Sequence, residues 1–379
     1  MILGAQLKES CNQQQAQMLK ELETMVKIET PTGYEEGLKK LRQTIIPWFE
    51  KIGCSTELLT SPEGVSTLVA TLKGKGKKKI MLQAHLDTVF PVGTEAGNPF
   101  RIENGKLRGP GCIDCKAGVV IGLHAMQLLQ KNNFTDFARI TFVMNSDEET
   151  SSLHSKDFIK QIAQEHDVAI VLEAAKPRHG ICVARKGMGK GVLTVKGKSV
   201  HAARYEQGIN AVEEICHQIL QFRKLTDKAK GTAVNITVVE GGKVTNTIPD
   251  YASAAVDVRV WDTTEFDRIT KEAAQINKNT LNPGAKAGFT IHFLPAFPEN
   301  AKTKALVAKL QPIYAEMGET METVTSPGIS DGNYIYTTGT PVIDGMSCIG
   351  MHAHTKDEDG APESIPVALY ALTRFIMEV

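Results

Sequence analysis

The sequence of 379 residues has no charge excess and few aromatic residues. Lys+Arg and Asp+Glu number 43 each, and aromatic residues make up 6% of the chain. A chain with zero formal net charge gives no overall electrostatic reason to bind nucleic acid or an anionic membrane. The 42% of hydrophobic residues is typical of a globular protein and excludes disorder, collagen and coiled coil. We therefore expect a small, uncharged or zwitterionic ligand.

Long apolar runs are also lacking. The longest, Ala117–Leu129, is shorter than the roughly 20 residues that span a bilayer and contains His124, so it predicts a buried helix. The N-terminus has no charged segment followed by an apolar core, which argues against a secretory signal. We expect a cytoplasmic protein with no membrane partner, although the sequence leaves a trimmed leader open.

The seven cysteines are an odd number and are scattered, which does not fit a disulfide framework. We therefore expect reduced thiols. The one close pair, Cys112 and Cys115, has no second pair that would complete a zinc ribbon. By itself, this C-x-x-C motif is weak evidence for a metal site.

The order of the predicted elements indicates two domains. In the first part of the chain, helices alternate with apolar strands such as 138–144 and 167–173, which is typical of a largely parallel sheet covered on both faces. From about residue 187 the predicted order is β-α-β-β-α-β, as in a ferredoxin-like α+β domain. The earlier pattern then resumes. The sequence thus predicts an α/β protein whose larger domain, 1–185 and 297–379, is interrupted by a smaller domain, 186–296.

Several side chains that could bind a metal lie beyond the carboxyl ends of apolar strands or in glycine-rich loops. In open α/β sheets, these strand ends form the ligand crevice. Two imidazoles and three carboxylates suit Zn²⁺, with Mn²⁺ or Co²⁺ as alternatives. These five candidates are His85, Asp114, Glu149, Glu173 and His354.

Two short patterns strengthen the metal hypothesis. Residues two apart on a strand face the same side, so Asp87 could accept the spare ring N–H of His85 and fix its tautomer. In the pair Glu148–Glu149, one carboxylate could bind metal while the other takes a proton from water. A single histidine or glutamate pair of this kind is more often a surface feature. Together they predict a metal hydrolase.

Eight phrases of the sequence, in the same order and across nearly the whole chain, resemble a known family. They are AHLDTVFPVGT, RGPGCIDCKAG, MNSDEETSS, LEAAKP, GKSVHAARYEQGINAVEE, TNTIPDYASAAVDVRV, PGISDGN and MHAHTKDED. The family is the M20 metallopeptidases, and within it the glutamate carboxypeptidase (carboxypeptidase G2-like) branch. The resemblance implies a zinc-peptidase catalytic domain interrupted by a dimerisation domain that acts as a lid.

The resemblance also implies a dinuclear zinc site. By motif, His85 and Glu173 would hold one ion, and Glu149 and His354 would hold the other. Asp114 would bridge the two ions. Such a site accounts for amide hydrolysis by water without a covalent intermediate.

Three further residues receive catalytic roles from the resemblance. Asp87 would orient His85, and Glu148 would be the general base that deprotonates water and passes the proton to the leaving amine. His201, in the lid, would reach into the site of the partner subunit and stabilise the tetrahedral oxyanion. A homodimer through the inserted domain would then be necessary for activity.

Arg259 and Asn246 resemble family positions that hold the C-terminal carboxylate of the substrate. A guanidinium group suits this task because it can bind a carboxylate through two parallel hydrogen bonds. The alternative is that Arg259 forms an ion pair with Asp257 or Asp262 on the lid surface.

Two positions depart from the family pattern. Cys115 follows Asp114 where many relatives have Asp or Met, and a thiol beside zinc adds a liability to oxidation or inhibition. Ile329 stands where a glycine would let the substrate backbone approach closely. The side-chain preference of the enzyme therefore stays open.

The sequence predicts a metallohydrolase that cleaves an amide bond next to a free carboxylate and releases glutamate or a similar amino acid from a peptide or an N-acyl compound. Two alternatives remain. A deacylase of the acetylornithine or succinyl-diaminopimelate type would share the metal centre and differ in the pocket. A catalytically dead binding module would have lost ligands, whereas all five ligand positions and Glu148 are present.

Overall fold

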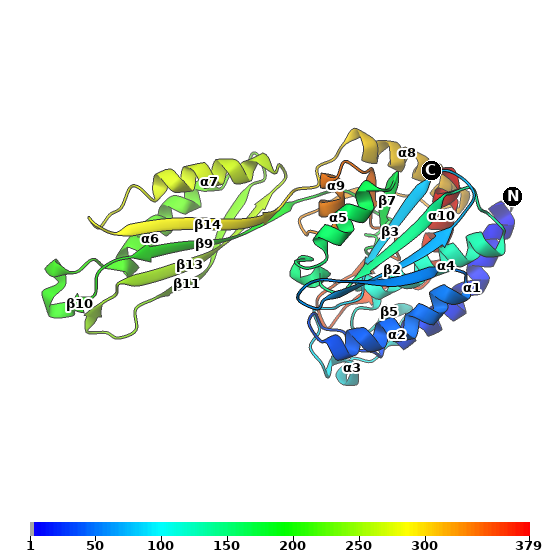
Figure 1. The fold of residues 1–379 in the computed structure, drawn as a ribbon, viewed down its shortest axis with the longest axis horizontal. Coiled ribbons are helices and arrows are strands. Elements are labelled where there is room, and N and C mark those ends of the chain that lie inside the picture. Colours follow the sequence, from blue (N-terminus) through cyan, green and yellow to red (C-terminus); the bar gives the residue numbers. More distant parts are fainter. Residues whose placement is uncertain (1–3) are drawn as a thin grey trace. The chain divides into compact units, whose positions relative to one another are not determined.

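The computed structural model describes residues 4–379, which form two compact units (Figure 1). The first unit contains the chain up to Val183 together with Glu299–Thr325 and Ser330–Val379. The second contains Ala184–Pro298 and the short segment Ser326–Ile329. Each unit has its own cluster of buried hydrophobic residues.

The first unit is built on an eight-stranded sheet with the order β1-β2-β6-β3-β7-β16-β8-β15. The four central strands β6, β3, β7 and β16 are parallel, whereas β1 and β2 on one side and β8 on the other pair antiparallel. This agrees with the predicted, largely parallel α/β architecture. The strands are β1 Ser55–Thr60, β2 Ser66–Lys73, β3 Lys79–His85, β6 Arg139–Asn145, β7 Val168–Val171, β8 Ile181–Arg185, β15 Thr323–Ser326 and β16 Val342–Asp344.

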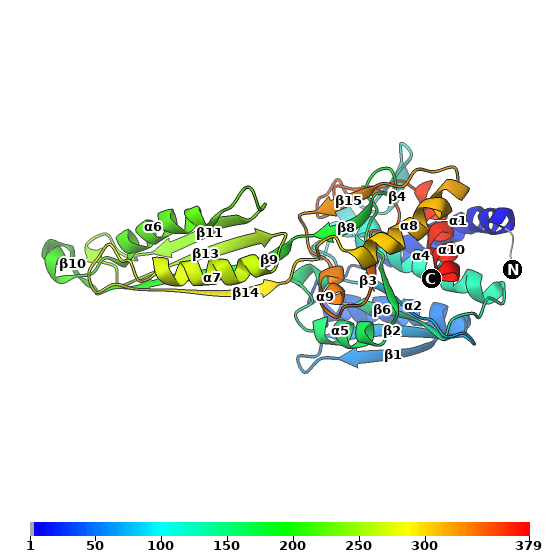
Figure 2. The same ribbon diagram turned by 90° about the horizontal axis from the view of Figure 1, so that it is seen from above.

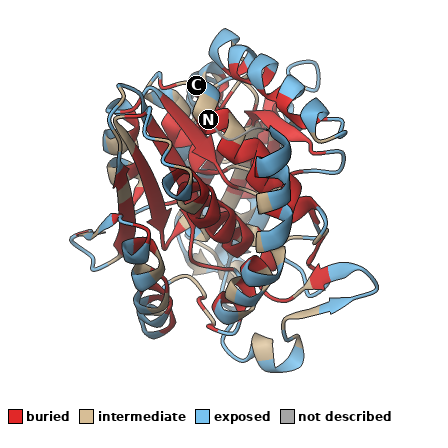
Figure 3. Cartoon of the chain, turned by 90° about the vertical axis from the view of Figure 1, so that its right-hand side faces the viewer, coloured by how far each residue is buried: buried red, intermediate tan, exposed pale blue. Residues whose placement is uncertain are grey.

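Helices lie on both faces of this sheet. On one face α1, α4 and α10 pack against one another, and their apolar residues join strand residues such as Leu68 and Ala70 in the core. On the other face α5 lies over β2 and β6, where Phe158 and Thr141 line a common cavity. Figure 3 shows buried strands and a buried helix surrounded by helices with exposed outer faces. The helices are α1 Gly4–Val26, α2 Glu35–Lys51, α3 Thr94–Gly97, α4 Ala117–Lys131, α5 Lys156–Gln164, α8 Ala301–Glu316, α9 Asp331–Thr337 and α10 Ser364–Glu378.

Within residues 4–379, one helical segment, Cys112–Lys131, is long and apolar enough to cross a membrane. Of its most apolar window, 89% is buried inside the protein, because α4 packs against α1 and α10. The predicted buried helix is confirmed.

A small four-stranded sheet, with the order β17-β18-β5-β4, joins distant parts of the first unit. Asp359 of β18 pairs with Arg108 of β5, so the loop before β18 lies beside the loop after β5. Those two loops carry His354 and Asp114. The strands are β4 Arg101–Glu103, β5 Lys106–Arg108, β17 Gly350–Met351 and β18 Asp359–Gly360.

The second unit is an antiparallel sheet with the order β11-β13-β9-β14 and two helices on one face (Figure 2). Buried and partly exposed residues alternate along β13, with Ala254, Val256 and Val258 in the core. This is the predicted β-α-β-β-α-β order. The elements are β9 Gly187–Lys196, β10 Val200–His201, α6 Ala211–Phe222, β11 Ala233–Gly241, β12 Thr247–Ile248, β13 Tyr251–Val260, α7 Thr264–Ile276 and β14 Lys286–Leu294.

Candidate metal centre

The parallel strands of the first unit bring three predicted site segments to one edge of the sheet. His85, the last residue of β3, is in register with Asn145 at the end of β6. The chain continues from Asn145 into the turn that carries Glu148. On the other side of β3, Gln83 is in register with Val171 of β7, which leads to Glu173. The sheet register therefore places these side chains together.

His85 is fully surrounded, with 1% of its surface exposed. Its Nδ1 lies 3.0 Å from the main-chain oxygen of Asp87 and 3.4 Å from Oδ1 of the same residue. Because a carbonyl oxygen can only accept, Nδ1 carries a proton in this hydrogen bond, and Nε2 is the ring nitrogen that a metal ion could bind. Nε2 lies 3.0 Å from Oδ1 of Asp114 and 3.6 Å from Oε1 of Glu173.

The contact between His85 and Asp87 differs in detail from the sequence prediction. Strand β3 ends at His85 and does not extend to Asp87, so Asp87 lies in the following loop. Its nearest contact to the ring is therefore through the main chain. The carboxylate of Asp87 instead accepts the N–H groups of Glu148 and Glu149, at 3.2 and 3.1 Å. Asp87 thus fixes both the His85 ring and the glutamate turn.

His354 contacts the second carboxylate oxygen of Asp114 and also contacts Glu149. Nε2 of His354 lies 3.0 Å from Oδ2 of Asp114 and 3.0 Å from Oε2 of Glu149. The two oxygens of Asp114 therefore contact two different imidazoles, His85 through Oδ1 and His354 through Oδ2. The five predicted ligands form one connected cluster.

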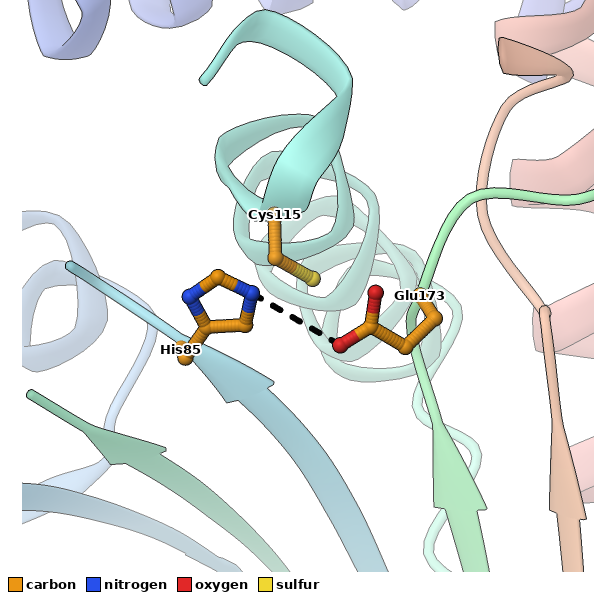
Figure 4. Close-up of side chains that lie close together, drawn as sticks. All are labelled: His85, Cys115 and Glu173. Atoms are coloured by element: carbon orange, nitrogen blue, oxygen red, sulfur yellow. Dashed lines mark ion pairs between the residues drawn. The ribbon is translucent and has the colours of Figure 1, made fainter. Parts of the chain in front are cut away.

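Two sets of donor atoms in this cluster are close enough to hold a metal ion. One set is His85, Asp114 and Glu149, and the other is His85, Cys115 and Glu173. In each set the donor atoms lie within 4.8 Å of one another. Figure 4 shows the second set, in which three side chains from different segments converge. Imidazole nitrogen and carboxylate oxygen are donors that Zn²⁺, Mn²⁺ and Co²⁺ accept, so the residues fit such a cation.

The electrostatics of the cluster also favour a cation. Hydrogen bonds to Asp114 and Glu149 raise the pKa of His354 to about 10. Burial opposes a charge on His85, but its hydrogen bonds to Asp114 and Asp87 prevail and raise its pKa well above the usual value. The carboxylates thus favour the positively charged form of both imidazoles. A bound metal ion would supply that charge in place of protons.

Glu148 has a different environment from Glu149. Burial, together with the neighbouring carboxylates of Glu173 and Asp331, raises the pKa of Glu148 well above the usual value. Asp331 itself is buried and accepts hydrogen bonds from Gln83 at 2.8 Å and from Ser152 at 2.5 Å. These buried polar groups support the turn on which Glu148 stands.

Glu358 has a positioning role that the sequence analysis missed. Its side chain is completely buried and accepts the N–H groups of Gly111, Ile113 and Asp114 at 3.0, 2.9 and 3.3 Å. It therefore holds the loop that presents Asp114. Glu358 follows His354 by four residues, but within the charged run KDED nothing marks it as buried.

His201 and Asn246, predicted for the lid, are neighbours in the second unit. His201 is exposed, and its Nδ1 accepts the N–H of Ala203 at 3.2 Å. It pairs with Thr247 between β10 and β12, and the adjacent Ala202 donates its N–H to the carbonyl of Asn246 at 2.8 Å. The second unit thus presents His201 and Asn246 from one small β-structure.

Arg259 lies elsewhere in the second unit. Its Nε and Nη2 contact Oδ1 and Oδ2 of Asp257, both at 3.2 Å, which is the ion pair considered as the alternative. Asn246 precedes the start of β13, at Tyr251, whereas Arg259 is near its end. From Tyr251 to Arg259 the strand spans about 26 Å at roughly 3.3 Å per residue. Arg259 and Asn246 are therefore not neighbours within one chain.

Comparison with known proteins agrees with this fold. The model of peptidase family M20/M25/M40 matches residues 81–378. Carboxypeptidase G2 of Pseudomonas sp. (strain RS-16) is 32% identical over 98% of this chain and 92% of its own length. Acetylornithine deacetylase of Proteus mirabilis is 28% identical over 61% of this chain and 62% of its own. The crystal structure of aminopeptidase PepT from Bacillus cereus superposes with a TM-score of 0.80 at 21% identity, over 96% of this chain and 98% of that one.

A two-unit α/β fold with a cluster of imidazoles and carboxylates at the carboxyl edge of its sheet defines a metallopeptidase. The chain belongs to peptidase family M20/M25/M40. The family resemblance noted in the sequence is thereby confirmed. The enzyme class, a peptidase hydrolase, is confirmed with it.

Proposed function

We propose that the protein is a dinuclear exopeptidase that hydrolyses an amide bond next to a free carboxylate. It would release C-terminal glutamate or a similar amino acid from a small peptide or an N-acyl amino acid. The observation that carries this proposal is the carboxylate of Asp114, whose two oxygens contact His85, at the end of β3, and His354, in the loop before β18. The similarity to a carboxypeptidase over nearly the full chain supports the choice of substrate class.

The proposed cofactor is two Zn²⁺ ions per chain, with Mn²⁺ or Co²⁺ as substitutes. His85 and Glu173 would hold one ion, Glu149 and His354 the other, and Asp114 would bridge them. When bound, such ions polarise an amide carbonyl and make water more acidic. The short contacts of Asp114 to both imidazoles support this division of the ligands.

In this proposal Glu148 moves the proton. Its carboxylate accepts a proton from the attacking water and then donates it to the nitrogen of the leaving amine. Asp87 assists by holding the N–H of Glu148 at 3.2 Å and so fixing the turn.

We also propose that the active unit is a homodimer formed through the second unit. Strand β11 is at the edge of its sheet, and Val238 and Val239 on it are 52% and 53% exposed. An exposed apolar edge strand is suited to pairing with another chain. In such a dimer, His201 of the partner subunit would stabilise the oxyanion of the reacting amide.

The substrate carboxylate would be held by residues of both chains. His201 and Asn246 lie on the same β-structure, so a partner that supplies His201 also supplies Asn246. Arg259 is remote from that structure along β13 and would come from the other chain. For this role Arg259 must exchange its ion pair with Asp257 for one with the substrate.

A second candidate is an N-acyl amino acid deacylase of the acetylornithine or succinyl-diaminopimelate type. The similarity to an acetylornithine deacetylase favours it, although over a smaller share of the chain. The metal centre would be the same, and only the pocket would differ. A catalytically dead binding module is the third candidate, and the presence of all five proposed ligand residues and Glu148 in the sequence argues against it.

The proposed location is the cytoplasm. All seven cysteines, which lie within residues 4–379, are free thiols, and six of them are buried. Free thiols in this number are typical of a reducing compartment.

A substrate panel tests the proposed function. Metal-loaded protein is incubated with dipeptides, N-acyl amino acids and a benzoyl-type glutamate amide, and the released amines are measured. We expect the fastest turnover for compounds with a C-terminal free carboxylate and a bulky acyl group. Turnover limited to N-acetyl or N-succinyl compounds would favour the deacylase. No turnover of any compound at full metal content would favour a binding module, and Glu148→Gln serves as the inactive control.

A further inference from the structure

Cys115 is the cluster residue that the proposed ligand set does not use. Its side chain is fully buried at the carboxyl edge of the sheet, next to the proposed bridging residue Asp114. Its Sγ belongs to the same set of close donor atoms as His85 and Glu173, all within 4.8 Å of one another. Figure 4 shows the thiol pointing toward the space between the imidazole and the carboxylate.

The present partner of the thiol is the main chain of Leu172. The Sγ–H group donates to the carbonyl oxygen of Leu172 at 3.0 Å. Leu172 directly precedes Glu173, so the sulfur and the Glu173 carboxylate are fixed by the same short segment.

The separation of the donor atoms suits a common metal ion. Zinc binds sulfur at about 2.3 Å and nitrogen or oxygen at about 2.0–2.2 Å, so donors of one tetrahedral ion lie roughly 3–4 Å apart. Nε2 of His85 and Oε1 of Glu173 are 3.6 Å apart, within this range, and the sulfur of Cys115 lies within 4.8 Å of donor atoms of both residues.

Cys112 provides an internal comparison. It is another buried cysteine in the same turn, three residues before Cys115. Among residues 4–379, Cys112 belongs to neither set of close donor atoms. Burial in this turn does not by itself bring a thiol to the metal site, and the position of Cys115 is specific.

We propose that Cys115 is a ligand, as a thiolate, of the metal ion held by His85 and Glu173. This inference rests on the proposed metal centre. When the ion binds, the S–H bond breaks, the proton passes to the solvent, and the sulfur lone pair forms the bond to the ion. The sulfur ligand would favour Zn²⁺, Co²⁺ and Cd²⁺ over Mn²⁺, because thiolates prefer softer cations.

Cobalt substitution tests the sulfur ligand. Metal-free full-length protein is titrated with Co²⁺, and the visible absorption of the bound ion is recorded with the near-ultraviolet absorption of sulfur-to-cobalt charge transfer. We expect the charge-transfer band in the unmodified protein and in Cys112→Ser, and its loss in Cys115→Ser. We also expect Cys115→Ser to lower the affinity for Zn²⁺ by about tenfold or more, with a smaller change for Mn²⁺.

The outcomes separate this inference from the proposed function. Bound cobalt without a charge-transfer band would overturn the role of Cys115 and leave the metal centre intact. No uptake of Co²⁺ or Zn²⁺ would overturn both. X-ray absorption of the zinc-loaded unmodified protein provides a measurement that needs no variant. A sulfur neighbour at about 2.3 Å from zinc supports the inference, and a shell of nitrogen and oxygen alone contradicts it.

Discussion

Oδ2 of Asp114 lies 3.0 Å from Nε2 of His354, although 240 positions separate the two residues in the sequence. The small sheet explains this contact. Asp359 of β18 pairs with Arg108 of β5, which brings the loop before β18 beside the loop after β5. Glu358 then ties the loops together by accepting three N–H groups around Asp114. The pairing of two candidate ligands is therefore a consequence of strand register.

Glu148→Gln should abolish most of the activity and retain the metal. The substitution keeps the size of the side chain and removes only its ability to accept a proton. We expect kcat to fall by roughly 10²–10⁴-fold, the range that general acid–base catalysis supplies. Kinetics and elemental analysis of the same preparation check this. Glu149→Gln is the matched control and should lose metal, whereas near-normal turnover of Glu148→Gln would show that another residue moves the proton.

Glu358→Gln should weaken metal binding although Glu358 is not one of the proposed metal ligands. The amide cannot accept three N–H groups as the carboxylate does, so the loop that carries Asp114 should lose its fixed position. We expect metal affinity to fall by about 10–100-fold, as for other groups that orient ligands. Asp357→Asn, at an exposed position one residue earlier, is the control. Equal affinities in the two variants would contradict the positioning role of Glu358.

Mixed dimers of two inactive variants should regain activity if His201 acts in the active site of the partner subunit. Glu148→Ala chains and His201→Ala chains are each expected to be inactive. After subunit exchange, one site of each mixed dimer has both residues intact, so activity should return. The exchange itself is followed by mass spectrometry with differently tagged chains. Exchange without recovery would place His201 in its own subunit's site or outside catalysis.

Arg259 should matter for substrates with a free carboxylate and much less for amidated ones. Arg259→Ala should lower kcat/KM for the substrate with a free carboxylate. The loss should correspond to about 2–5 kcal/mol if water is excluded from the contact between Arg259 and the carboxylate, and to less if water reaches that contact. Arg259→Lys should restore only part, because lysine lacks the planar fork. Asp257→Asn removes the present ion-pair partner of Arg259 and should not lower kcat/KM for the substrate with a free carboxylate. Equal cleavage of acid and amide by the unmodified enzyme would refute the exopeptidase proposal.

Much of the site could be anticipated because local patterns encode it. Apolar strands followed by polar residues indicated which side chains gather at the carboxyl edge, and the structure brings His85, Glu149 and Glu173 there. The end of β3 at His85 was less predictable, because Leu86 and Val89 continue the apolar pattern into the loop. That difference gives Asp87 its second contact, to the glutamate turn.

Other features depend on tertiary contacts that no local pattern contains. Glu358 lies in a charged run that usually indicates an exposed loop, and only its burial against the Asp114 loop shows its function. The ion pair of Arg259 with Asp257 was the alternative to a substrate-binding role, and the sequence left its partner open between Asp257 and Asp262. In the same way, the C-x-x-C spacing did not reveal that Cys115 alone points to the cluster.

Metal content per chain tests the central claim most directly. Protein freed of metal with a chelator is dialysed against Zn²⁺, separated from unbound ion and measured by elemental analysis together with the protein concentration. We expect close to two ions per chain, because five ligands with one bridging carboxylate form two sites with room for water. We also expect Asp114→Asn to lower this content for both sites. A chain that binds no transition metal, and gains no activity with Zn²⁺, Mn²⁺ or Co²⁺, would contradict this claim.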